Sequence, residues 1–252
     1  MARPPRCLVE DLGPDVITLG AAARNHLIGA LRTRPGALVE LVDGRGGLAT
    51  ARLGDQARLE VIERLPPLPP AADGLTLAVA IPRPSRLDWL VEKAVELAVT
   101  RLVPLETRHG ERTLGAERRA RLLRLADEAL LQCRRLHRLQ IGAPVTLAAL
   151  LDAATAAVPR PEIWLAAPPP ATTAAPHGDA PLPRRSPRRP LLVLIGPEGG
   201  FDASELAAAA DVGAAHVQFG ETVLRVETAA LALAVLARAA IPVGDPPTGS
   251  LR

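Results

Sequence analysis

The fold of this chain is decided by the stretch LLVLIGPEGGF, residues 191–201. Its first five residues are apolar, and a glycine-rich loop follows them. An apolar run of this length between turn signals predicts a strand that is buried on both faces of a parallel sheet. Because ligands of such sheets bind beyond the carboxyl ends of the strands, loop 196–201 is a candidate wall of a binding pocket. A short helix is expected to begin at Asp202.

The loop does not match the known phosphate-binding glycine signatures. Its spacing differs from the dinucleotide fingerprint, and Pro197 removes a backbone donor where a phosphate would need one. It is not a P-loop either, since no Lys-Ser/Thr pair follows the last glycine. Exposed carbonyls and the carboxylate of Glu198 suit a nucleoside base and a cationic ligand. On this segment alone, a simple strand-to-helix turn stays an open alternative.

A second loop of the same kind follows closely in the sequence. Residues 216–219 read as a strand, Gly220 marks a turn, and LRVETAAL, residues 224–231, leads into an apolar helix. Arg225 and Glu227 lie just before that helix. Loops that follow neighbouring parallel strands meet at one edge of the sheet, so the two loops are predicted to wall one pocket.

Taken together, IGPEGGF (195–201) and LRVETAAL (224–231) resemble the ribosomal-RNA uridine-N3 methyltransferase family, RsmE-type, of the SPOUT superfamily. The resemblance implies an α/β fold with a SPOUT-type parallel sheet and a C-terminal trefoil knot, preceded by a small PUA-like β-barrel. It also implies S-adenosyl-L-methionine as methyl donor, a uridine of 16S ribosomal RNA in the 30S subunit as substrate, a homodimer, and no metal. A SPOUT enzyme with another RNA target and a non-catalytic, RNA-binding ribosome assembly factor are the alternatives.

A proline-rich connector, LPPLPP at residues 65–70, separates two predicted domains, 1–68 and 74–245. In the first, segments 37–42 and 48–53 flank a glycine-containing turn, which is typical of a β-hairpin. A helix is expected over 22–32. Residues 168–190 are rich in proline, alanine and arginine and are predicted to be a disordered loop, with its arginine pairs solvated.

Composition narrows the class of protein. The net charge is +3 and the pI about 9.6, with Lys93 as the only lysine. Arginine contacts phosphates well, so this bias permits a nucleic-acid partner, although a GC-rich genome also produces it. Cys7 and Cys133 form neither a disulfide framework nor a metal-site spacing. No apolar run is long enough for a bilayer, and no signal-peptide core is present, so a cytoplasmic protein without membrane contact is expected.

Two helices carry further parts of the family pattern. The first is expected to begin at Ser85 with a capping box completed by Asp88, and it matches the pattern at Trp89, Glu92, Lys93, Glu96 and Leu97. The second, over 117–136, matches at Glu128, Gln132 and Arg135. Ala98 and Arg134 stand where the family usually has glycine.

These observations and the resemblance give three sets of candidate residues. The catalytic candidates are Arg225, which would stabilise the anion formed when uridine N3 loses its proton, and Glu198. The cofactor-binding candidates are Leu165, Ile195, Gly196, Pro197, Glu198, Gly199, Gly200, Phe219, Gly220, Leu224 and Thr228. The RNA-binding candidates are Arg6, His26, Arg32, Arg86, Lys93, Arg108, Gln132 and Arg135.

Each assignment has a plainer alternative. Glu227 is a second candidate proton acceptor, but an acidic residue at a helix start is favourable by itself. Thr228 would either cap that helix or contact the cofactor. Lys93 would form a surface ion pair with Glu96, a weak interaction, and each basic residue of the first domain would be solvated surface.

Overall fold

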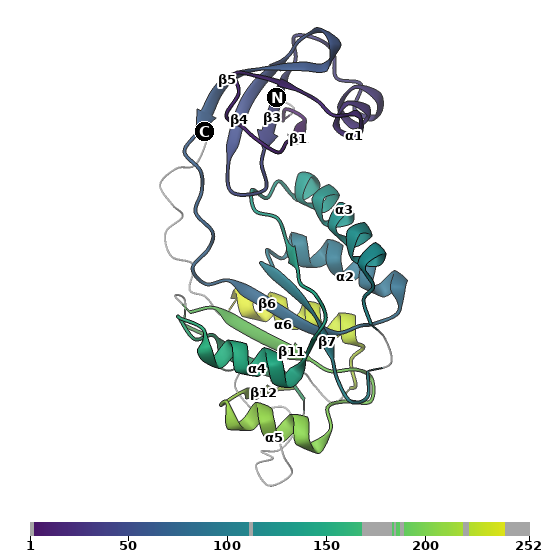
Figure 1. Ribbon diagram of the computed structural model, residues 1–252, viewed down its shortest axis with the longest axis vertical. Helices are drawn as coiled ribbons and strands as arrows, with labels where there is room; N and C mark the ends of the chain where they lie inside the picture. The colour runs from purple at the N-terminus through teal and green to yellow at the C-terminus, as the bar shows by residue number, and fades with distance from the viewer. Residues whose placement is uncertain are drawn as a thin grey trace. The chain divides into compact units, whose positions relative to one another are not determined.

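The computed structural model describes residues 3–110, 113–167, 183, 185–186, 189–218 and 222–239 (Figure 1). The chain divides into two compact units. The first comprises residues 1–71 and 124–138, and the second comprises residues 72–123 and 139–252. The first unit is therefore discontinuous in sequence, because it includes a segment that follows the connector by more than fifty residues.

The first unit is built on a five-stranded sheet in the order β1-β3-β4-β5-β2. Its strands are β1 (Arg6–Leu8), β2 (Val16–Thr18), β3 (Leu38–Val42), β4 (Leu48–Leu53) and β5 (Arg58–Leu65). The expected hairpin is confirmed, since β3 and β4 pair antiparallel, and Gly44 and Gly46 adopt positive φ in its turn. Leu27, Leu41 and Leu59 are among its fully buried core residues.

The helix expected over 22–32 is only partly regular. Helix α1 (Ala21–Arg24) continues as a widened turn, η1 (Asn25–Ala30), in which the Leu31 amide donates to the His26 carbonyl five residues back, at 3.0 Å. A short 3₁₀ turn, η2 (Asp55–Ala57), precedes β5. Leu27 is the buried residue of the widened turn, which leaves its remaining side chains at the surface.

The segment 124–138 is bonded to the β3–β4 hairpin within the first unit. The Gly46 amide donates to the Leu136 carbonyl at 3.0 Å, and the Arg138 amide donates to the Gly44 carbonyl at 2.9 Å. The carboxylate of Glu40 on β3 accepts hydrogen bonds from the guanidinium groups of Arg6 and Arg134. The second half of α3 (Ala116–Cys133) and the residues after it therefore complete this unit.

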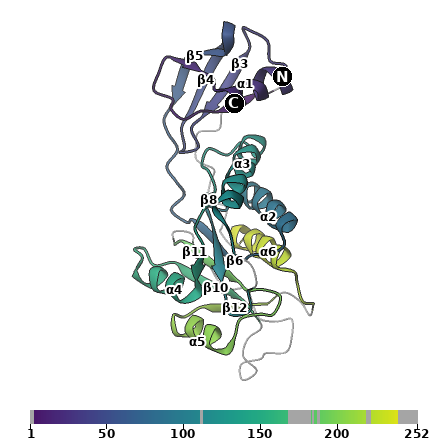
Figure 2. The same ribbon diagram turned by 45° about the vertical axis from the view of Figure 1, so that its right-hand side comes forward.

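The second unit contains a parallel sheet in the order β12-β10-β11-β6-β7-β8, with β9 also paired to β7 (Figure 2). Its strands are β6 (Leu75–Ala80), β7 (Arg101–Glu106), β8 (Gln140–Ile141), β9 (Val145–Thr146), β10 (Glu162–Ala166), β11 (Leu191–Ile195) and β12 (Ala215–Val217). All five residues of β11 are buried between β10 and β6, which confirms the strand predicted from the apolar run.

Helices cover both faces of this sheet. Leu192 and Leu194 pack in one core cluster with residues of α4 (Leu147–Ala156) and α5 (Ala203–Asp211). On the opposite face, α6 (Val226–Ala239) contacts β6 and β11, and α2 (Pro84–Glu96) contacts α6 (Figure 1). A strand covered on both faces needs no polar face, which explains the unbroken apolar run. Among the described helices, none has both the length and the apolar character of a membrane span.

The two predicted helix starts have different outcomes. Helix α5 has Asp202 as N-cap with a complete capping box, because the Asp202 amide donates to Glu205 and the Glu205 amide donates to Asp202, each at 2.8 Å. Hydrogen bonds from the Ser204 hydroxyl and from backbone amides lower the pKa of Asp202. The capping box expected at Ser85 is wrong. Pro84 occupies the first helical position, where its fixed φ fits, so α2 starts before Ser85 with Arg83 as N-cap.

The expectation that both arginine pairs of segment 168–190 are solvated is wrong for Arg185. Most of that segment lies outside the described residues, but the Arg185 side chain is buried. It donates to the Ala237 carbonyl at 2.7 Å and lies 3.6 Å from the Asp73 carboxylate. Burial lowers the pKa of Arg185, which stays charged at neutral pH. Arg185 therefore fastens the end of α6 to the start of the sheet.

Ala98 and Arg134 occupy the left-handed positions that end two helices. Their φ angles are +57° and +62°. At the end of α2 the Val99 amide donates to Ala94 and the Ala98 amide donates to Val95, at 2.9 and 3.1 Å, which is the hydrogen-bond pattern of a Schellman motif. Residues with a Cβ are disfavoured in this conformation and glycine is not. This explains physically why glycine is usual at both positions in the family pattern.

We expect Ala98→Gly to stabilise the protein by about 1 kcal/mol, because glycine removes the left-handed penalty and only part of the gain is lost to the greater freedom of the unfolded chain. Urea unfolding followed by circular dichroism measures the change. The matched control is Ala120→Gly, an exposed site inside α3, where the same substitution should destabilise by about 1 kcal/mol. A lower unfolding midpoint for Ala98→Gly would contradict the assignment.

Candidate active site

The loop after β11 depends on its glycines for close packing. A Cβ on Gly196 would lie 2.9 Å from the ring of Phe201, and a Cβ on Gly199 would lie 3.3 Å from the Cβ of His109. Gly200 has φ +73°, and its amide donates to the Pro197 carbonyl at 2.9 Å, closing a tight turn. The loop is therefore a compact backbone surface with few side chains of its own.

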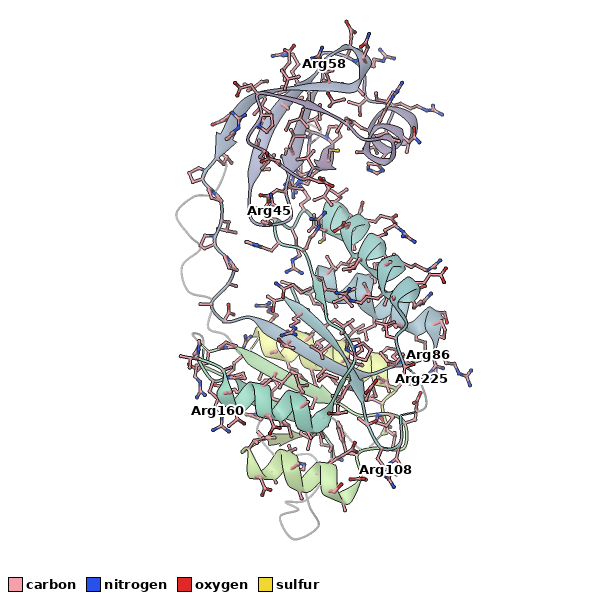
Figure 3. The ribbon with its side chains drawn as sticks, in the orientation of Figure 1. Arg45, Arg58, Arg86, Arg108, Arg160 and Arg225 are labelled. Carbon is pink, nitrogen blue, oxygen red and sulfur yellow. The ribbon has the colours of Figure 1, made fainter. Side chains whose placement is uncertain are left out.

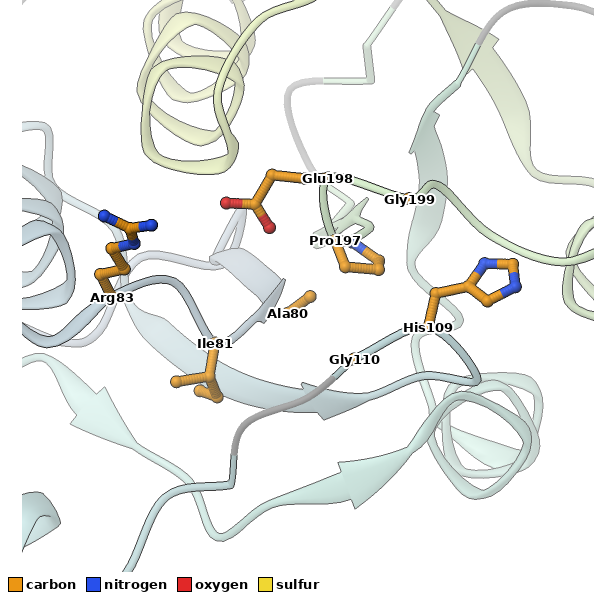
Figure 4. Close-up of a pocket in the computed structure, with 8 residues that line it drawn as sticks. All are labelled: Ala80, Ile81, Arg83, His109, Gly110, Pro197, Glu198 and Gly199. Carbon is orange, nitrogen blue, oxygen red and sulfur yellow. The ribbon is translucent and has the colours of Figure 1, made fainter.

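A cavity of about 390 Å³ lies beside this loop. Its walls come from the loops after three adjacent parallel strands, β6, β7 and β11 (Figure 4). The lining residues are Ala80, Ile81, Arg83, His109, Gly110, Pro197, Glu198 and Gly199. The cavity therefore lies at the carboxyl edge of the sheet, where ligand sites of such folds are found.

Arg86 joins the two predicted loops. Its Nε lies 3.4 Å from Oε1 of Glu227, and its Nη1 lies 4.0 Å from Oε1 of Glu198. The side chain of Glu227 is 8% exposed, whereas that of Glu198 is 56% exposed. Oε2 of Glu227 is buried and has no hydrogen-bond partner among the described residues. Arg86, in the first turn of α2, thus faces the carboxylate of the β11 loop and that of Glu227, which is the second residue of α6 and not, as expected, a residue before the helix. The sequence did not predict this placement.

The residues around the start of α6 differ in exposure. The carbonyl of Arg225 accepts a hydrogen bond from the Ala229 amide at 2.8 Å, so the Arg225 backbone begins the helix. The Arg225 side chain, labelled in Figure 3, is exposed. Arg225 forms no ion pair with the described residues. Thr228 is an exposed residue inside α6, so the alternative that it caps this helix is wrong. Leu224 is half-buried.

The remaining cofactor-binding candidates lie near the same edge of the sheet. Leu165 is buried in β10 and Ile195 is the last residue of β11, its neighbour in the sheet. Phe219 and Gly220 lie outside the described residues. The candidates from β10, the β11 loop and the start of α6 are therefore brought to neighbouring elements of the second unit.

Of the RNA-binding candidates in the first unit, Arg6 is the most constrained. It is buried, and its Nε and Nη2 donate to Glu40 at 2.9 and 2.6 Å. His26, Arg32 and Gln132 are exposed, and Arg135 is half-buried. Arg6 is therefore held by the Glu40 carboxylate, whereas the other three candidates of this unit are exposed or half-buried.

The candidates in the second unit have defined neighbours. Lys93 donates to Glu96 at 2.7 Å and to Glu92 at 2.9 Å, so the surface ion pair expected as its plainer role is present. These hydrogen bonds raise the pKa of Lys93. Arg108 is exposed in the loop after β7, and its amide donates to Glu205 at 2.8 Å. Arg86 lies between the two glutamates, as described above.

Sequence reasoning missed two residues that line the cavity, Arg83 and His109. Neither belongs to a recognisable motif. Arg83 follows β6 and His109 follows β7, and a rule that every loop at the carboxyl edge contributes to the site would have found them. Among the described residues, no group of three or more histidine, cysteine, aspartate or glutamate side chains is placed to hold a metal ion.

Comparison with known proteins agrees with this geometry. Residues 69–238, which include the cavity and both loops, match the RNA methyltransferase domain family. The ribosomal RNA small subunit methyltransferase E of Synechocystis sp. is 30% identical over 221 residues, covering 84% of this chain and 69% of the relative. The same-named protein of Mycobacterium tuberculosis is 55% identical over 40 residues, 16% of this chain and 15% of the relative.

Two solved structures share the fold over nearly the whole chain. Ribosomal RNA small subunit methyltransferase E from Neisseria gonorrhoeae, bound to S-adenosyl methionine, has a TM-score of 0.78 at 25% identity and covers 94% of this chain and 98% of that one. A probable rRNA-methyltransferase from Porphyromonas gingivalis has a TM-score of 0.77 at 26% identity with the same coverage. The chain belongs to the RsmE-type family of RNA methyltransferases, as its two motifs predicted.

Proposed function

We propose that this protein is an S-adenosyl-L-methionine-dependent methyltransferase that methylates N3 of one uridine in 16S ribosomal RNA. The observation that carries the proposal is that the family match over residues 69–238 includes the whole cavity, Arg86 and both glutamate-bearing loops. The Neisseria relative, similar over 94% of this chain, binds S-adenosyl methionine.

The residues proposed to hold the methyl donor fit such a ligand chemically. Three glycines leave the β11 loop a backbone surface with few side chains, and the ends of β10 and β11 supply apolar walls at Leu165 and Ile195. The remaining members of the proposed set are Pro197, Glu198, Phe219, Gly220, Leu224 and Thr228. When bound, the donor supplies a methyl group that its sulfonium has already activated for transfer.

The chain's own residues would then act on the acceptor. Transfer requires the uridine N3 to lose its proton and to be held in line with the methyl group. The Arg225 guanidinium, free of ion pairs with described residues, is proposed to stabilise the negative charge that develops on the uracil oxygens. Glu198 or Glu227 is proposed to accept the proton, and Arg86 would hold both carboxylates in place.

The proposal extends to the architecture around the site. We propose that residues 1–68, completed by residues 124–138, form a PUA-like RNA-binding barrel, and that the rest of residues 74–245 forms the SPOUT domain with its C-terminal trefoil knot. Among the RNA-binding candidates named from the sequence, the exposed His26, Arg32, Arg108 and Gln132 and the half-buried Lys93 and Arg135 are proposed to contact the substrate. Arg6 is buried against Glu40, and Arg86 lies between the two glutamates. The protein is further proposed to act as a homodimer in the cytoplasm, and Trp89 on α2 and Val235 on α6, which are 46% and 49% exposed, are the apolar residues proposed to lie in its interface.

Methylation of 30S particles that lack the modification tests the function. We expect the purified protein to transfer one methyl group per particle from S-adenosyl-L-methionine, and mass spectrometry of the nucleosides to identify N3-methyluridine. Isolated 50S subunits serve as the control and should remain unmodified. A different methylated nucleoside would indicate another RNA target. Tight binding to the particle without methyl transfer would instead support an assembly factor and contradict the proposal.

A further inference from the structure

The cavity beside the β11 loop shares Pro197, Glu198 and Gly199 with the residues proposed to hold the methyl donor, but its other walls lie outside that set. The donor candidates outside the loop come from β10 and the start of α6, whereas the cavity is lined from the loops after β6 and β7. In the sheet, β11 lies between β10 and β6. Its loop therefore borders both regions, with Pro197, Glu198 and Gly199 lining the cavity.

The walls of the cavity suit a nucleoside. About 390 Å³ is within the range of small-molecule sites and is large enough for one pyrimidine nucleoside. Ala80, Ile81 and Pro197 give apolar surface for the faces of a ring, and the carboxylate of Glu198 gives an acceptor for an N–H group. In Figure 4 the Glu198 carboxylate points toward the side of the cavity that Arg83 occupies.

Two side chains at the cavity are available to an RNA strand. Arg83 is exposed and forms no ion pair or side-chain hydrogen bond with the described residues, so its charge is free for a phosphate. The Nδ1 atom of His109 lies 3.2 Å from the Gly200 carbonyl oxygen. A carbonyl only accepts, so this contact places the ring proton on Nδ1 and leaves Nε2 for another partner.

A second hollow, more open, adjoins the cavity and extends it toward Arg108. Its volume is about 500 Å³, and it is lined by Arg108, His109, Gly110 and Gly199. Three of these residues also line the first cavity. The two hollows are continuous, with Arg83 lining the first and the exposed Arg108 lining the second. Cationic side chains placed along a hollow in this way can contact the phosphates on both sides of one nucleotide of an RNA strand.

We propose that the cavity receives the target uridine after it has been turned out of the RNA, with Arg83 and Arg108 contacting the phosphates that flank it. Enzymes that modify a base move it into a pocket in this way. The inference rests on the proposed function, and it specifies the part of the protein that the substrate uridine enters. It places the acceptor beside the methyl donor, with residues 197–199 of the β11 loop common to both regions and Glu198 on the wall of the acceptor's cavity.

The test compares Arg83→Ala with wild type and with the control Arg160→Ala, which removes an exposed arginine at the opposite end of the second unit. We expect Arg83→Ala to raise KM for the RNA about tenfold and to lower the slope of log binding against log salt by about one. The affinity for S-adenosyl-L-methionine, measured by calorimetry, should stay within about twofold. Arg160→Ala should match wild type in all three measurements.

Photocrosslinking locates the nucleotide independently of these kinetics. An RNA fragment of the substrate with 4-thiouridine at the methylated position should cross-link to peptides 80–83 or 107–110. If wild type methylates the RNA but the cross-link maps to the first unit, or Arg83→Ala keeps the wild-type KM and salt slope, the cavity assignment is overturned while the proposed function stands. If wild type methylates no ribosomal RNA, the proposed function fails and the assignment fails with it.

Discussion

Replacing Arg225 with alanine is expected to lower the turnover number about 100- to 1,000-fold, while the dissociation constant for S-adenosyl-L-methionine changes less than about threefold. A decrease in turnover number of this size is typical when one preorganised group that stabilises an oxyanion in the transition state is removed. The side chain is exposed and has no ion-pair partner among the described residues, so its removal should leave the fold intact. Single-turnover methylation of 30S particles measures the rate, and calorimetry measures donor binding.

Two controls separate chemistry from folding in that experiment. Arg225→Lys keeps the charge but loses the planar fork, so it should recover only part of the activity. The unfolding midpoints of wild type and both variants should agree. An unchanged rate for Arg225→Ala would remove this arginine from the mechanism, and an equal loss of donor affinity and rate would reassign it to donor binding.

Replacing Arg86 with alanine is the second change with a large expected effect. It leaves Glu227, a carboxylate that is 8% exposed, without its cationic neighbour. We expect a loss of about 2 kcal/mol in stability. This is less than the cost of breaking a fully buried pair, because Arg86 itself is partly exposed. The turnover number should fall about 10- to 100-fold, because Glu198 and Glu227 lose the group that faces both.

A double-mutant cycle distinguishes positioning from general destabilisation. In Arg86→Ala with Glu227→Gln, the uncompensated charge is gone, so most of the lost stability should return while the activity stays low. Urea unfolding and the methylation rate are measured on all four proteins. If Arg86→Ala is as stable and as active as wild type, the contact across the two loops has no functional importance. If the stability losses simply add, the two side chains do not interact.

Much of the second unit could be predicted because its signals are local. The apolar run of β11 and the start of a helix at Asp202 each depend on a few neighbouring positions, and both predictions are confirmed. Helix α4 (Leu147–Ala156) was missed because its sequence is almost uniformly alanine and leucine, so it shows no polar face from which a helical period can be read.

What could not be predicted depends on residues that are distant in sequence. Arg86 and Glu227 are 141 positions apart, and no local pattern relates them, so Arg86 was assigned to RNA rather than to the two carboxylates. Arg83 and His109 likewise become a pair of cavity residues only when β6 and β7 are placed beside β11. Periodicity predicts which face of an element is buried, but it does not predict which loops face one another.

The discontinuous first unit has a consequence for how the chain folds during synthesis. When the ribosome has made residues 1–71, Glu40 lacks Arg134, and the hairpin amide of Gly46 and carbonyl of Gly44 lack their partners at Leu136 and Arg138. The unit can be completed only after residue 138 has left the exit tunnel. A fragment truncated after the proline connector would therefore be an incomplete folding unit, and a faithful excised version must carry the 124–138 segment through a redesigned linker.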